Sequence, residues 1–478
     1  MSVFSELLKT YTERCGMTVV SLAKQCGVDR TTLHKIISGE RRPPNNDFVL
    51  KLSRLLMLSS SERDKLTEQY EISLVGDELY KRRRNVSEMI RKLSDLGSAV
   101  DIEPSAFYPM KRENVKAHSL YHSRQELLRA CYSYFAAELE QGCDISIIAQ
   151  PVEELCNFLK YVSAYYNKSS IKHIFCLDNG SGSGEANAHN LGLFPGICEL
   201  AYLYSGYTPM YYYDCVDSHI NSATLLPVVI IGKSFVMCAD NELENGMIFS
   251  MPDVVEFYSR EFSKLEKMCY VFVERARNIA GMIGTGSSYH DYLLSLDEQP
   301  SLMLVSREKG INEGLHLPAE QKKWFIEKMN FLKERYYKSD YKVIFSVDGL
   351  RRLMTTGIVK ELPGEICSPL SLQERIWVLE NMIEKTEQGI YNFRVIESGV
   401  SPSERLRINL DTDGAVHFVL RSRGEYVFMT VGEQSVKIAM NDYFTHLFES
   451  GKIFDKGRSI EIMRGVLAET KEEFGEPG

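Results

Sequence analysis

Residues 18–39 constrain the fold of this chain more than any other stretch, because they predict two short helices held at a fixed angle by a glycine turn. Thr18 can cap the first helix, and Leu22 with Ala23 forms its inner face. Gly27 follows at the point where a side chain would crowd or strain the turning backbone. Asp29 can then cap the second helix. The stretch therefore predicts a helix-turn-helix unit.

The second helix of this pair has one apolar and one polar side. Leu33, Ile36 and Ile37 recur at helical spacing and are expected to face inward. Five side chains that can form hydrogen bonds remain on or near the outward side: Arg30, Thr31, Thr32, His34 and Lys35. Such a helix suits the major groove of DNA, where base edges present hydrogen-bonding groups.

This stretch resembles the XRE family of helix-turn-helix proteins, the group of the lambdoid phage repressors and Cro. The resemblance covers about residues 3–70. A basic, proline-terminated segment over residues 40–44 is similar to the family's exit from the second helix. Val19 departs from the pattern, since many members carry there a glutamine that contacts phosphate. The positions that carry the resemblance are Leu22, Ala23, Gly27, Val28, Leu33, Ile36 and Gly39.

The resemblance implies an all-α, five-helix, lambda-repressor-like domain over residues 1–71. Apolar residues between 48 and 56 predict its fourth helix, and Ser59 with Glu62 predicts a capping box for the fifth. The five outward side chains of the second helix would contact bases, while Thr18, Arg41 and Arg42 would contact the DNA backbone. A helix-turn-helix can instead dock to a protein or to RNA, and that alternative stays open.

Length and composition indicate a multidomain α+β protein. A chain of 478 residues is too long for one ordinary core and predicts two to four domains. Its 44% hydrophobic and 25% charged residues are typical of a soluble globular protein, and no apolar run approaches the roughly 18 residues of a membrane span. The first residues show no basic segment followed by an apolar one. We therefore expect no secretory signal, no membrane association and a cytoplasmic location.

The cysteines and the charges narrow the expected partners. The 11 cysteines show no Cys-x-x-Cys pair and no close Cys/His cluster. We therefore expect them to be reduced core residues, and we expect no metal and no cofactor. A redox or metal sensor is the alternative.

Charge is distributed unevenly along the chain. Residues 1–100 hold 17 Lys/Arg and 13 Asp/Glu, whereas the whole chain has a net charge of −9. Only this front end suits a polyanion. Within it, Lys81–Arg84 could contact phosphates or form a solvated helix face.

The pattern beyond the helix-turn-helix predicts four further parts. Residues 72–104 form a connector helix whose amphipathic face includes Val86, Met89, Ile90 and Leu93. A first α/β, sensor-like unit follows over 105–275. Residues 276–367 are expected to be a mainly helical intervening segment, and 368–478 a second, shorter α/β unit.

Two pairs of similar segments within residues 105–478 favour an internal duplication. Residues 122–151 and 370–398 share a helix, a Gln-Gly stop and a strand. The hairpins expected over 228–237 and 416–428 each lead to an aromatic-rich helix. Such a duplicated unit resembles phospholipase D-like domains, whose catalytic signature begins His-x-Lys. None of the ten histidines in this sequence has a lysine two positions later. The resemblance therefore implies a domain without that catalytic activity, with a ligand-binding or assembly role.

Motifs for catalysis are not found. Gly232-Lys-Ser234 lacks the spacing and the following helix of a phosphate loop, and the glycine-rich stretches at 180–184 and 284–288 are better explained as loops. No nucleophile elbow or zinc helix is present in the sequence, so we expect no enzyme. The six tyrosines between 202 and 213 fit a small-molecule pocket, a subunit interface or ordinary packing.

Together these features predict a sequence-specific DNA-binding transcription regulator of bacterial or phage type. The second helix of the helix-turn-helix would lie in the major groove of double-stranded DNA. One module covers a short site, so we expect a homodimer held by the region after residue 100. That region would sense a small-molecule effector or mediate assembly. An interaction protein that docks to protein or RNA, and an enzyme with an unrecognised site, are the alternatives.

Overall fold

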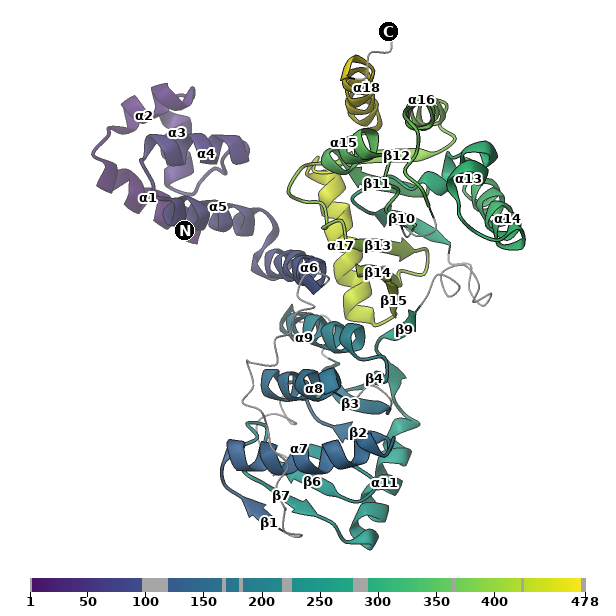
Figure 1. Cartoon of the computed structure of the whole chain (residues 1–478). Coiled ribbons are helices and arrows are strands. Elements are labelled where there is room, and N and C mark those ends of the chain that lie inside the picture. Colours follow the sequence, from purple (N-terminus) through teal and green to yellow (C-terminus); the bar gives the residue numbers. More distant parts are fainter. Residues whose placement is uncertain are drawn as a thin grey trace. The chain divides into compact units, whose positions relative to one another are not determined.

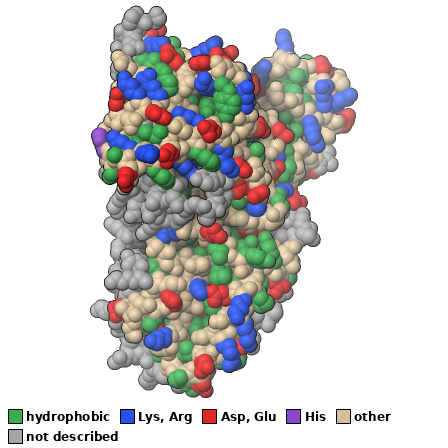
Figure 2. Space-filling model, turned by 90° about the vertical axis from the view of Figure 1, so that its right-hand side faces the viewer, with side chains coloured by type: hydrophobic (Ala, Val, Ile, Leu, Met, Phe, Trp, Pro, Cys, Tyr) green, Lys and Arg blue, Asp and Glu red, His purple; other side chains and the backbone are tan. Residues whose placement is uncertain are grey.

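The protein consists of two compact units, Met1–Asn85 and Val86–Gly478. Figure 1 shows the computed structural model, which describes residues 2–96, 119–165, 169–179, 184–216, 226–277, 291–362, 364, 367–422 and 425–473. No helix in these ranges is long and apolar enough to cross a bilayer. Basic and acidic side chains lie interspersed on the face shown in Figure 2.

The first unit is helical. Its apolar core includes Phe4, Leu8, Leu22, Leu52 and Leu66, which come from four different helices of the unit. The predicted capping box is confirmed, because Ser59 and Glu62 each bond the other's backbone N–H at the start of the last of these helices. The helices are α1 (Val3–Cys15), α2 (Val19–Cys26), α3 (Arg30–Ile37), α4 (Asn46–Leu55) and α5 (Ser60–Val75).

The second unit begins inside helix α6 (Asp77–Leu96). The predicted apolar face of this helix is buried: Val86, Met89, Ile90 and Leu93 belong to the main core of the α/β region. Ser94 also accepts two hydrogen bonds from Ser403, its hydroxyl from the Ser403 backbone N–H and its carbonyl from the Ser403 hydroxyl. The second half of the predicted connector helix therefore belongs to the α/β region. Residues 97–104 of the prediction lie outside the described residues.

The first sheet of the second unit has the strand order β1-β7-β6-β5-β2-β3-β4-β8 within the described residues. Strands β2, β3 and β4 run parallel, and the other pairs are antiparallel. The strands are β1 (Ser119–Tyr121), β2 (Ile145–Ile148), β3 (Ile171–Asp178), β4 (Tyr207–Asp214), β5 (Val228–Ile231), β6 (Val236–Ala239), β7 (Gly246–Phe249) and β8 (Tyr270–Val271).

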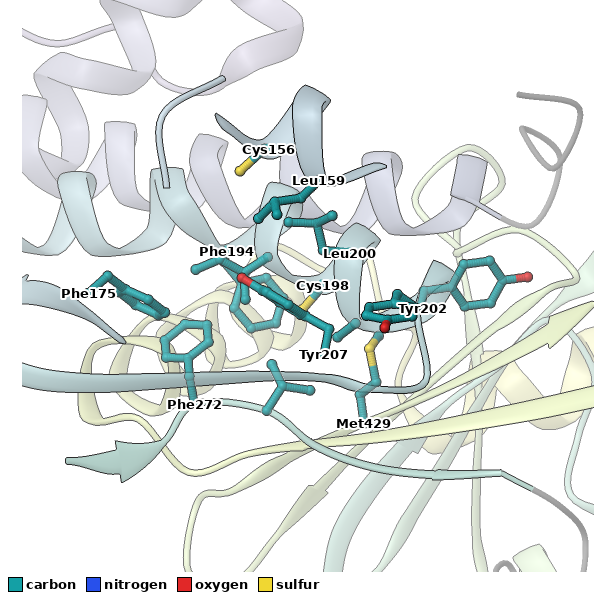
Figure 3. Close-up of a cluster of buried hydrophobic side chains, with 14 of the residues drawn as sticks. Cys156, Leu159, Phe175, Phe194, Cys198, Leu200, Tyr202, Tyr207, Phe272 and Met429 are labelled. Atoms are coloured by element: carbon teal, nitrogen blue, oxygen red, sulfur yellow. The ribbon is translucent and has the colours of Figure 1, made fainter. Parts of the chain in front are cut away.

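Helices cover both faces of this sheet. One face packs against α7 (Arg124–Glu140), α8 (Glu153–Tyr165) and α9 (Gly184–Leu203), and α11 (Pro252–Glu266) covers the other. Figure 3 shows part of the core on the first face, where aromatic rings of Phe175, Phe194, Tyr207 and Phe272 gather. Met429 from the second sheet joins the same cluster, so the two sheets share one continuous core.

The second sheet has the order β12-β11-β10-β13-β14-β15-β9 within the described residues. Its strands are β9 (Glu274–Arg277), β10 (Tyr292–Leu296), β11 (Lys342–Ser346), β12 (Asn392–Ile396), β13 (Leu406–Asp411), β14 (Val416–Ser422) and β15 (Glu425–Val431). α17 (Gln434–Glu449) packs on one face. The other face carries η2 (Leu302–Leu304), α14 (Ala319–Arg335), α15 (Val347–Thr356), α16 (Leu372–Glu387) and α18 (Lys456–Glu473), with α13 (Glu308–Gly314) beside α14.

The two sheets repeat one strand order. In each, three successive strands run parallel, the fourth returns antiparallel beside the first of them, and two more antiparallel strands follow (β2 to β7 and β10 to β15). A helix then leads back to the third parallel strand, which pairs with Val271 in one sheet and bridges to Ile453 in the other. Lys172-His-Ile-Phe175 in β3 and Lys342-Val-Ile-Phe345 in β11 occupy matching places.

The structure corrects two details of the predicted organisation. Residues 276–367 are not a separate, mainly helical segment, because β10 and β11 lie in the second sheet between β12 and β13. The segments 122–151 and 370–398 do not occupy matching places, since β2 lies inside its sheet and β12 at an edge. The hairpins predicted over 228–237 and 416–428 are β5–β6 and β14–β15, and in the shared strand order β6, not β5, is the counterpart of β14. A helix followed by a strand occurs at every crossover between parallel strands. This order of elements therefore cannot by itself define which segments of the two sheets correspond.

Candidate nucleic-acid interface

The turn between α2 and α3 is fixed by local hydrogen bonds. The hydroxyl of Thr18 accepts from the backbone N–H of Ser21 at 3.2 Å and so caps α2. Gly27 ends that helix with a φ of 79°, in the left-handed region that glycine adopts without strain, and donates to the Ala23 carbonyl at 3.0 Å. Asp29 caps α3 by accepting from the N–H of Thr32 at 2.7 Å. The predicted caps and glycine turn are confirmed.

The inner side of α3 is anchored in the core of the first unit. Leu33 and Ile36 are buried, and Ile37 is half-buried and packs on the same cluster. α3 contacts both α1 and α2. Because the apolar side of α3 is packed in the core, the opposite side of the helix is held facing outward from the unit.

The outward side of α3 presents four of the five predicted side chains. Arg30, Thr31, His34 and Lys35 are exposed. Thr32 is half-buried, and its hydroxyl donates to Asp29 at 2.6 Å. Thr32 is thus brought into the helix cap, while the other four form a continuous polar surface that can reach a ligand.

The acid at the start of α3 stays ionised. Hydrogen bonds from the side chain and backbone of Thr32 hold the pKa of Asp29 below its usual value. The negative charge lies at the positive end of the helix dipole, where it stabilises the helix. It also stands beside Arg30, so the surface is not uniformly basic.

The three residues predicted to contact the DNA backbone are all exposed, and in the chain they flank the pair of helices α2 and α3. Thr18 stands at the N-cap of α2. Arg41 follows α3, and one of its guanidinium nitrogens lies 3.5 Å from the Thr32 hydroxyl, so its side chain folds back along that helix. Arg42 lies next to it in the chain. Val19, the residue that departs from the XRE pattern, is half-buried and packs against the core.

The basic run at the start of α6 is partly compensated. Lys81 pairs with Asp77 at 2.7 Å, Arg82 with Glu78 at 4.0 Å, and Arg84 with Glu68 at 3.1 Å. The Lys81 and Arg84 side chains are exposed, whereas that of Arg82 is only 18% exposed, and exposed pairs contribute little to stability. They favour the solvated-face interpretation of Lys81–Arg84 over a dedicated phosphate site.

Two contacts that position the motif could not be seen in the sequence. The ammonium of Lys51 donates to the Cys26 carbonyl at 3.2 Å, at the end of α2. Arg14 on α1 pairs with Glu62 on α5 at 2.5 Å, and the Arg14 hydrogen bond lowers the pKa of Glu62 to about 2. Both join segments far apart in the chain, so no local pattern marks them.

The predicted tyrosine-rich segment mostly packs in the core. Tyr202, Tyr204, Tyr207 and Tyr211 are buried, whereas Tyr213 is 38% exposed and donates to Glu433 at 2.6 Å. These contacts fit the packing alternative. The segment lies in the second unit and takes no part in the helix-turn-helix.

Comparisons with known proteins agree with this geometry for the first unit. Residues 3–66 match a family model described as a helix-turn-helix domain. The chain therefore carries a helix-turn-helix domain, a class of module that binds nucleic acid.

The remainder of the chain is not assigned by comparison. No curated protein matches it. A polyphosphate kinase from Porphyromonas gingivalis is similar at 11% identity and a TM-score of 0.21. That match covers 72% of this chain and about half, 52%, of the kinase. A likeness this low supports no statement about fold or activity.

Proposed function

We propose that this chain is a sequence-specific DNA-binding transcription regulator of the XRE type. The observation that carries the proposal is the outward side of α3, where Arg30, Thr31, His34 and Lys35 are exposed while the opposite side is fixed in the core. A helix held in this way can enter the major groove with its base-contacting side chains in a defined register. Arg30 is the natural partner of a guanine edge.

The contacts to the DNA backbone come from both ends of the motif in this proposal. Thr18 lies at the start of α2, and Arg41 and Arg42 follow α3. Such contacts position the module on the duplex without reading its sequence. Lys81–Arg84 plays no part in the proposal, because its pairs with Asp77, Glu78 and Glu68 already offset much of its charge.

The second unit provides regulation in this proposal. A small-molecule effector acts there, and the chain works in the cytoplasm as a homodimer, because two modules on a two-fold site give the affinity that one short site lacks. The two sheets derive from an internal duplication; their common strand order and the matching Lys-x-Ile-Phe segments support this. The proposal assigns no catalytic activity and no cofactor to this unit.

Binding experiments test the DNA-binding assignment. Selection from a random duplex pool supplies the preferred operator, and anisotropy titration then compares the chain with its Arg30→Ala variant. We expect the variant to lose about 1–3 kcal/mol of binding free energy and to lose preference at one base pair. Lys65→Ala, an exposed lysine on α5, is the matched control and should bind as the original chain does.

Salt dependence separates DNA binding from the alternatives. Counterion release predicts that the affinity for duplex DNA falls steeply between two salt concentrations. Equal affinity of the chain and the Arg30→Ala variant for the operator would refute the assigned side of α3. Tight binding to single-stranded RNA or to a protein, with no saturable binding to any duplex, would replace the proposal with an interaction function.

A further inference from the structure

A cavity of about 320 Å³ opens on the helical face of the second sheet. It lies between the chain just after η2, the end of α14, one side of α16 and the residues before β12. Its volume is at the lower end of the range of small-molecule sites, roughly 300–1,000 Å³. Three cationic and three aromatic side chains line it: Arg307, Lys333, Lys385, Tyr337, Trp377 and Tyr391.

The aromatic part of the cavity is held in place by its surroundings. The guanidinium of Arg307 lies 4.6 Å from the centre of the Trp377 ring. The hydroxyl of Tyr391 donates to the Lys333 carbonyl at 3.2 Å, which fixes its ring. Tyr337 is exposed at the rim. Ordered rings of this kind offer flat apolar faces to a planar group at little entropic cost.

The cationic part is not fully compensated. Arg307 forms a bidentate pair with Glu374, its Nε donating to Oε1 at 3.0 Å and its Nη2 to Oε2 at 2.5 Å, so its charge is balanced. The ammonium of Lys333 donates only to the Ser306 carbonyl, and the described residues offer it no ion pair. Burial lowers the pKa of Lys333, while the charge of Glu308 opposes this effect.

A second lysine adds to this charge. The carboxylate of Glu384 stands 4.0 Å from the Lys385 ammonium, at the limit of an ion pair. Trp377, Asn381 and Lys385 follow one another at intervals of four along α16, so they share one side of that helix. The amide of Asn381 donates to the Val305 carbonyl at 3.0 Å and holds this side against the chain after η2.

We propose that this cavity binds a nucleoside monophosphate, with the phosphate between Lys333 and Lys385 and the base against Trp377 and Tyr391. Two ammonium groups with weak or no carboxylate partners match a dianion, and the neighbouring rings match a planar base. The volume of about 320 Å³ leaves room for a mononucleotide. This inference rests on the proposed function, for which it supplies the effector class and its site.

Tryptophan fluorescence reports directly on the cavity. The chain has 2 tryptophans, and Trp324 lies on α14 outside the lining residues. A Trp324→Phe chain therefore leaves Trp377 as the sole tryptophan. Titration of this full-length protein with AMP, GMP, CMP and UMP, without DNA, should give saturable quenching with at least one of them. Inorganic phosphate alone and the free nucleoside should each bind at least about tenfold more weakly, because each fills half of the site.

Substitutions test the assigned lysines. In the Trp324→Phe background, Lys333→Gln and Lys385→Gln should each weaken nucleotide binding by about tenfold or more. Lys323→Gln on α14 is the matched control and should leave the affinity unchanged, because the Lys323 side chain is 80% exposed and its ion pair with Glu327 is 3.9 Å long. Urea unfolding verifies that each variant is folded. Lys385 is half-exposed, so its variant remains informative if Lys333→Gln is unstable.

The outcomes separate this inference from the proposed function. Absence of saturable quenching with all four nucleotides up to about 1 mM, or an equal loss in the Lys323→Gln control, would overturn the cavity assignment. Operator binding measured in the same samples bears only on the DNA-binding function. If a nucleotide binds at the lysines and changes the operator affinity, both the site and its regulatory role are supported.

Discussion

At the scale of single residues, His173 shows how burial sets a chemical state. Its Nε2 lies 3.0 Å from the Ala149 carbonyl and its Nδ1 lies 2.8 Å from the Tyr207 hydroxyl. A carbonyl can only accept, so Nε2 carries the proton and Nδ1 accepts from Tyr207. Burial lowers the pKa of His173 to about 4, from an ordinary 6.5. The imidazole is therefore neutral in the folded protein at neutral pH.

A pH dependence of stability follows from this shift. The unfolded chain takes up the proton near pH 6.5 and the folded chain only near pH 4, so the contribution is fully present above 6.5 and is lost as the pH falls toward 4. The loss amounts to about 3 kcal/mol. Urea unfolding at several pH values should show it, and His173→Gln, which can keep both hydrogen bonds, should flatten the curve in that window. Identical pH profiles for the two proteins would contradict the assignment.

At the scale of elements, local signals were sufficient for the first unit and insufficient for the second. The caps at Thr18, Asp29 and Ser59 and the turn at Gly27 depend on residues at most three or four apart, so the sequence could predict them. β10 pairs instead with β13, more than a hundred residues later. Its register is set by tertiary packing, and five-residue strands of a buried sheet show no alternation that marks them.

Two helical glycines give a test at the same scale. A Cβ on Gly349, in α15, would lie 1.9 Å from the backbone oxygen of Glu298, so the helix would have to move away from the end of β10. A Cβ on Gly465, in α18, would meet nothing within 4 Å. We expect Gly349→Ala to destabilise the protein by roughly 1–3 kcal/mol, and Gly465→Ala to stabilise it by up to about 1 kcal/mol. Equal unfolding midpoints for both variants would show that α15 is not packed this closely.

At the scale of the whole molecule, the cavity in the second unit could not be predicted from the sequence, and the reason is geometric. The residues around the cavity are spread from Leu304 to Tyr391 and meet only when α14 and α16 pack on one face of the sheet. The helix-turn-helix side chains, by contrast, all lie on one short helix. A contiguous site can be predicted from spacing, whereas a site assembled across a fold requires the fold.

The division into two units predicts where the chain can be cut. The compact first unit ends at Asn85, but α6 continues and buries Val86, Met89, Ile90 and Leu93 in the core of the second unit. Burial of each such side chain contributes roughly 1.5–3 kcal/mol, which in total rivals the whole stability of a domain, about 5–15 kcal/mol. A fragment of residues 77–478 should therefore unfold at nearly the same urea concentration as the second unit of the full chain.

A fragment of residues 97–478 lacks this helix, and it should unfold at a much lower urea concentration or aggregate, because the apolar surface that α6 covers becomes exposed. The matched control is residues 77–478 with Glu88→Gln, an exposed change on α6 that leaves the buried side chains intact. Unfolding curves followed by circular dichroism decide the matter. Coincident curves for the fragments that begin at 77 and 97 would mean that α6 contributes nothing to the stability of the second unit.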